Sequence, residues 1–125
     1  MTIDHKQVIR LLNRARTDLS SASYLSRFDQ PAAMGMTYMS MMHAGVALMW
    51  KSGFRSGRTQ RYQSLISGVR KILGEIGRQL VLTFNRLRQK ENQFEYEAFY
   101  EMEPEGLKEA IREAHKFVDL VSKHL

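Results

Sequence analysis

Apolar residues recur every three or four positions over two long stretches of the chain, which is the spacing of one buried face of an α-helix. The first stretch covers residues 4–28, and the second follows Pro104. Each predicts one amphipathic helix whose apolar stripe faces a core. The inward positions are Val8, Leu11, Leu12, Ala15, Leu19, Ala22 and Leu25 in the first helix, and Leu107, Ile111, Ala114, Val118 and Val121 in the last.

A different pattern follows the interruption at Asp29, Gln30 and Pro31. Residues 31–50 contain no Asp, Glu, Lys or Arg and include six methionines, so they predict a helix that is apolar nearly all round. The stretch approaches the length of a membrane span. Its glycines, hydroxyl side chains and His43 lower its hydrophobicity, so we interpret it as a buried central helix of a soluble protein.

Helical spacing continues more weakly through the middle of the chain. Residues 51–57 hold two glycines and two serines and predict a loop, and helices are expected over 59–73 and 78–99. Gly74 and Gly77 lie between these two helices. The fold class predicted is all-α, an up-and-down bundle of four to five helices, with residues 1–125 forming a single domain.

Composition narrows the chemistry further. The chain has no cysteine, which excludes disulfides, thiolate nucleophiles and cysteine-ligated metals. The first sixteen residues carry charges throughout and lack the apolar segment of a secretory signal, so a cytoplasmic location is expected.

Positive charge is concentrated in the middle of the sequence. Residues 51–90 contain ten Lys or Arg and one acidic residue, whereas residues 91–125 contain four Lys or Arg and nine acidic residues. The middle segment therefore predicts a surface for RNA or nucleotide phosphate, and the alternative is that its arginines pair with the acidic last helix. The candidate binding residues are Arg55, Arg58, Arg61, Arg86, Arg88 and Lys90.

No catalytic or metal-binding motif stands out. The four histidines are dispersed, and His115 with Asp119 would give a metal only two ligands, so neither a metal nor a cofactor is expected. His43 is the one histidine on the central helix. We interpret it as a structural residue satisfied by a hydrogen bond in the core, with a role as a base as the alternative.

Four stretches in order resemble the HEPN superfamily of prokaryotic helical bundles: LLNRARTDLSSASYL, AAMGMTYMSMMHAGVALMWKSGFRS, LRQKENQFEYE and EAIREAHKFVDLV. The resemblance covers almost the whole chain. It implies a homodimer and a role among ribonucleases and RNA-processing, toxin-antitoxin or defence systems, often beside a nucleotidyltransferase partner protein.

The superfamily's ribonuclease motif is an Arg, a polar residue, three variable residues and a His. Here Glu91 stands at the Arg position, Asn92 at the polar position and Tyr96 at the His position. A carboxylate repels phosphate, and a phenol is a poor base at neutral pH. The leading hypothesis is therefore a non-catalytic domain that binds RNA, a nucleotide or a partner protein. The alternatives are a metal-independent ribonuclease that uses Asn92 and Tyr96, and a homo-oligomeric interaction module.

Overall fold

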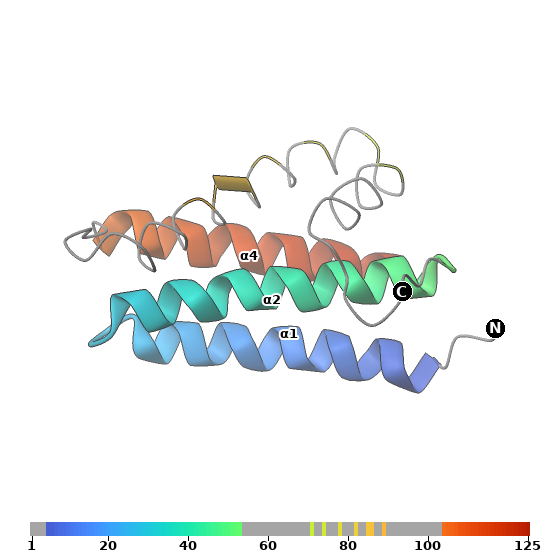
Figure 1. Cartoon of the computed structure of the whole chain (residues 1–125), viewed down its shortest axis with the longest axis horizontal. Coiled ribbons are helices and arrows are strands. Elements are labelled where there is room, and N and C mark those ends of the chain that lie inside the picture. Colours follow the sequence, from blue (N-terminus) through green and yellow to red (C-terminus); the bar gives the residue numbers. More distant parts are fainter. Residues whose placement is uncertain are drawn as a thin grey trace.

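The computed structural model of the chain is an all-α bundle (Figure 1). It describes residues 5–53 and 104–125, together with seven single residues between them: Lys71, Gly74, Arg78, Leu82, Asn85, Arg86 and Gln89. Three helices are described from end to end. They are α1 (His5–Leu25), α2 (Gln30–Lys51) and α4 (Pro104–His124).

Helix α2 lies between the other two. It runs antiparallel to α1 because only four residues join them, and α4 packs on α2 in the same direction as α2 (Figure 1). Helices α1 and α4 also touch, and the Arg16 guanidinium donates a 3.0 Å hydrogen bond to Ser122 Oγ across that contact. The start of α1 and the end of α4 consequently lie at the same end of the bundle.

Local signals fix both ends of α2. The Asp29 carboxylate accepts a hydrogen bond of 3.1 Å from the Ala32 amide, which satisfies one free N–H of the first turn, and Pro31 needs no acceptor there. Beyond Lys51 the chain turns at Gly53, whose φ of +90° lies in the left-handed region that favours glycine. The predicted end of this helix is therefore confirmed.

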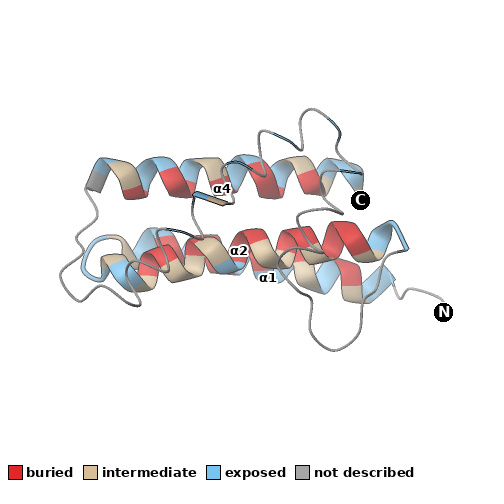
Figure 2. Cartoon of the chain, turned by 45° about the horizontal axis from the view of Figure 1, so that its top comes forward, coloured by how far each residue is buried: buried red, intermediate tan, exposed pale blue. Residues whose placement is uncertain are grey.

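Apolar residues of all three helices meet in one core. Figure 2 shows the buried positions on the sides of α1, α2 and α4 that face one another. The largest fully buried side chains are Phe117, Leu19, Met34, Met41, Leu48 and Leu107. All five inward positions predicted for the last helix are buried, and so are five of the seven predicted for the first, with Leu11 and Leu25 half-buried.

The structure corrects the predicted pattern at three points. Helix α1 ends at Leu25, and residues 26–28 form a turn in which Asp29 N donates 2.8 Å to Leu25 O. Met39 is 40% exposed, so the central helix is not covered on every side. Phe117 belongs to the core, although it lies outside the predicted stripe of the last helix.

The helices predicted over 59–73 and 78–99 fall mostly outside the described residues. The seven described residues in that part of the chain are all helical, and Gly74 has a φ of +62° at the place where the first of these helices was expected to end. None of the helices described has the length and hydrophobicity that a membrane span requires. That residues 1–125 form a single domain stays a prediction.

Candidate functional site

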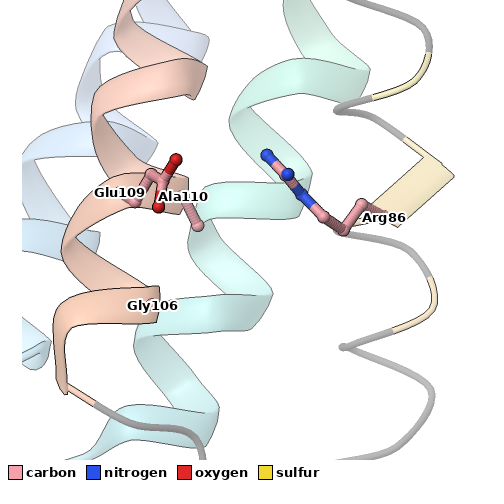
Figure 3. Close-up of a pocket in the computed structure, with 4 residues that line it drawn as sticks. All are labelled: Arg86, Gly106, Glu109 and Ala110. Carbon is pink, nitrogen blue, oxygen red and sulfur yellow. The ribbon is translucent and has the colours of Figure 1, made fainter.

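Arg86 lines a small pocket beside the start of α4. Its side chain projects toward that helix, where Gly106, Glu109 and Ala110 form the other walls (Figure 3). Gly106 has no side chain to fill the space, and Ala110 is buried and short. The pocket volume of about 40 Å³ holds a few water molecules or the tip of a charged group.

Charge of both signs meets at this pocket. Arg86 brings a guanidinium and Glu109 a carboxylate, and both residues are exposed. Arg86 belongs to the basic middle segment and Glu109 to α4, so the pocket places a carboxylate near one of the basic side chains, as internal pairing would require. The same geometry leaves the Arg86 guanidinium accessible to a phosphate from outside, so Glu109 is a competitor for that phosphate.

Of the predicted binding residues, Arg86 is the one that the structure describes. Arg55, Arg58, Arg61, Arg88 and Lys90 lie outside the described residues, and so do Glu91, Asn92 and Tyr96 at the motif position. The described basic side chains between 51 and 90 are Lys51, Lys71, Arg78 and Arg86, and each of them is exposed.

A second polar site joins α1 and α2. Asp18 occupies the inward face of α1 and is 1% exposed, and its Oδ2 lies 2.6 Å from Nδ1 of His43 on α2. Arg14, one turn earlier on α1, places Nε at 3.5 Å from the other carboxylate oxygen. The antiparallel packing of the two helices brings these residues together although Asp18 and His43 are 25 positions apart.

This contact holds the imidazole of His43 in one orientation. An ionised Asp18 carboxylate only accepts hydrogen bonds, so His43 Nδ1 must carry the proton between them. In a neutral ring the lone pair then sits on Nε2, and the His43 side chain keeps 23% of its surface exposed. An oriented imidazole of this kind can accept a hydrogen bond or a proton from a bound molecule.

The sequence predicted a hydrogen bond for His43, and this is confirmed, but it did not identify the partner. The available signal was Asp18 itself, which interrupts the apolar stripe of α1 between Ala15 and Leu19. A carboxylate on a buried face requires a hydrogen-bond donor from a neighbouring helix.

The other described histidines carry no comparable geometry. His115 and Asp119 are both exposed on α4, and His124 Nδ1 lies 3.0 Å from the Leu120 carbonyl oxygen of its own helix. Within the described ranges, no group of three or more His, Asp or Glu side chains converges in a way that would hold a metal ion.

Comparison with known families decides the identity of the bundle. A family model described as the HEPN domain matches residues 8–124, from the first turns of α1 to the end of α4. The chain belongs to the HEPN family. A search among curated proteins gave no match.

Membership of the HEPN family accounts for the helical fold of the chain. HEPN domains are helical, commonly oligomerise, and are associated with RNA-related, toxin-antitoxin and defence functions. The match spans α2 and α4 and all but the first residues of α1.

Proposed function

We propose that this HEPN domain binds RNA without cleaving it, as a homodimer, through basic residues of the segment 51–90. The observation that carries the proposal is the exposure of Lys51, Lys71, Arg78 and Arg86. Exposed cations on a chain of net charge +6 attract a polyanion through release of its counterions. The Glu91 and Tyr96 substitutions supply the reason for binding without cleavage.

Arg86 is the residue on which to test this proposal. Arg86→Glu should weaken binding of a fluorescent single-stranded RNA roughly tenfold at about 50 mM salt. Each phosphate contact with a single strand contributes a slope of about −0.7 to the dependence of log K on log salt concentration, so the loss of one contact lowers the affinity by about this factor at low salt. Fluorescence anisotropy measured at several salt concentrations gives both the affinity and the slope. Lys123→Glu, the same reversal of charge on an exposed residue at the far end of α4, is the control.

Glu109→Gln distinguishes two roles for Arg86, binding of RNA phosphate and internal pairing with α4. If Arg86 contacts phosphate, removing the competing carboxylate raises RNA affinity and leaves stability nearly unchanged. If Arg86 instead serves as an internal partner of α4, Glu109→Gln lowers the melting temperature and RNA affinity stays the same. The second result, with unchanged binding in Arg86→Glu, would remove Arg86 from the RNA surface.

The partly exposed imidazole that Asp18 orients favours a second candidate function, metal-independent cleavage of RNA. His43 Nε2 would take the proton of a ribose 2′-hydroxyl while the 2′-oxygen attacks phosphorus and the 5′-oxygen leaves with a proton from water. In this mechanism His43 serves as the general base, a role for which the Tyr96 phenol is poorly suited at neutral pH. Asn92 and Tyr96 would contact the phosphate.

Cleavage is tested on a gel with RNA incubated in the presence of EDTA. We expect intact RNA with the wild-type protein, as the leading proposal requires. The ribonuclease hypothesis would replace the binding hypothesis if the wild-type protein shortens the RNA and His43→Gln or Tyr96→Phe leaves it intact. The control His115→Gln, on the exposed side of α4, should then still cleave. If the wild-type protein neither binds nor cleaves RNA, a partner protein such as a nucleotidyltransferase becomes the better-supported ligand.

A further inference from the structure

One outward row of α1 is exposed from its first turn to the turn that follows the helix. Its members on the helix, from Lys6 to Tyr24, are three or four residues apart, so they lie on the side of α1 that points away from α2 and α4, and Arg27 and Phe28 continue the row in the turn that follows. This outer stripe consists of Lys6, Arg10, Asn13, Thr17, Ser20, Tyr24, Arg27 and Phe28, and all eight residues are exposed. From Lys6 to Tyr24 it extends for roughly 27 Å at about 1.5 Å per residue.

The outer stripe carries positive charge only. Asp18 is the single acidic residue between His5 and Phe28, and it faces inward to His43. Exposed helix faces normally mix acidic and basic residues, since pairs of opposite charge at i and i+4 stabilise the helix. A face that carries Arg10 and Arg27, with no carboxylate among its own members, is instead complementary to a polyanion.

Two aromatic rings stand at one end of the stripe. Tyr24 is 65% exposed and Phe28 is 64% exposed, and they meet edge to face with their centroids 5.1 Å apart and their planes at 84°. Neither ring is covered by the core that lies on the other side of α1. An exposed aromatic face beside cations is the combination on which the bases of single-stranded nucleic acids stack.

The hydroxyl groups between the two ends favour RNA over a protein partner. Thr17 Oγ1 donates to the Asn13 carbonyl at 3.1 Å and Ser20 Oγ donates to the Arg16 carbonyl at 3.3 Å, so both oxygens keep lone pairs toward solvent. They can accept hydrogen bonds from ribose 2′-hydroxyls. A docking protein helix would need a continuous apolar groove, and apolar surface on this stripe is confined to the aromatic pair.

We propose that the outer stripe of α1 is a second contact surface for single-stranded RNA. Arg10 and Arg27 contact phosphates, and Tyr24 with Phe28 stacks an unpaired base. This inference rests on the proposed RNA binding and adds a surface that lies outside the basic segment 51–90. It also predicts a preference for unpaired RNA, because the bases of a duplex are not available for stacking.

The test compares three variants of the full chain with the wild-type protein. Tyr24→Ala combined with Phe28→Ala removes the rings, and Arg10→Glu reverses one charge of the stripe. Met39→Ala is the matched control, since Met39 is a 40% exposed apolar residue on α2, outside both proposed RNA surfaces. Each protein is titrated into a labelled 12-nucleotide uridine RNA and into an RNA duplex of the same length, and light scattering gives its mass.

Loss of the two rings should weaken binding of the uridine RNA roughly tenfold, with little change for the duplex or for Met39→Ala. Arg10→Glu should weaken both RNAs and lower the salt slope. If the wild-type protein binds but the double variant binds equally well, the α1 surface is wrong and the proposed function stands. If the wild-type protein does not bind, both fail. A change of molecular mass in the double variant without a change in affinity assigns the rings to contact between copies, and this too overturns the inference.

Discussion

The environment of Asp18 restricts which residues can replace it. Its carboxylate is buried on α1 and accepts from His43, with Arg14 at its edge. A buried polar group that loses its partner pays the full cost of desolvation, whereas a partner at the surface returns to water. The stability of the fold therefore depends on the contact between Asp18 and His43 more than on either side chain alone.

Replacing Asp18 by Ala should lower the free energy of unfolding by roughly 1–3 kcal/mol, because His43 Nδ1 loses its acceptor inside the bundle. Asp18→Asn should cost less, since the amide oxygen can still accept. Urea denaturation followed by circular dichroism measures both values. Arg14→Ala is the control and should change stability by no more than about 1 kcal/mol, because the Arg14 side chain is 65% exposed. An equal effect of Asp18→Ala and Arg14→Ala would contradict the structural role of the pair.

At the scale of single helices, the turn between α1 and α2 shows how local chemistry sets an element boundary. Asp29 caps α2 through the Ala32 amide, and Pro31 follows in the first turn. Asp29→Ala should lower stability by about 1 kcal/mol, and Asp29→Ser should retain most of it, because serine is also a favoured N-cap. Thermal unfolding of the two variants side by side tests this. A loss as large for serine as for alanine would mean that Asp29 acts by charge and not as a cap.

Helices with one apolar stripe could be located from the sequence, because periodicity is a local property. The predicted extents of α1 and α4 agree with the structure to within a few residues, and Gly53 ends α2 where the glycines predicted an end. Helix α2 is apolar nearly all round, so its sequence does not show which side faces the core. For this reason the exposure of Met39 could not be predicted.

The sites depend on contacts between helices, and these a single sequence does not specify. Asp18 meets His43, and Arg86 lies beside Glu109, because of how the helices pack. The segment with most of the predicted binding residues lies outside the described residues, so those positions stay predictions. Charge density in the sequence does not single out the outer stripe of α1, because basic residues are denser in the segment 51–90.

At the scale of the whole molecule, α4 completes the core that α1 and α2 begin. Phe117 is 1% exposed, and among the residues that the structure describes it is the largest fully buried side chain. Phe117→Ala should therefore lower the free energy of unfolding by about 3–5 kcal/mol through lost burial and the cavity left behind. Leu82→Ala, at an exposed position, should stay within about 0.5 kcal/mol of the wild type. Both values come from chemical denaturation, and a small effect of Phe117→Ala would mean that α4 is not needed for the core.

The late position of α4 in the chain has a consequence for the protein as it is made. Helices α1 and α2 form a hairpin closed by a four-residue turn, whereas the Arg16 to Ser122 contact spans 106 positions. At translation speeds of about 5–20 residues per second, the roughly 50 residues after α2 take several seconds to synthesise. During that interval the side of α2 that packs on α4 is not yet covered by that helix. We expect the nascent hairpin to be the stage at which apolar surface of this bundle is open to aggregation.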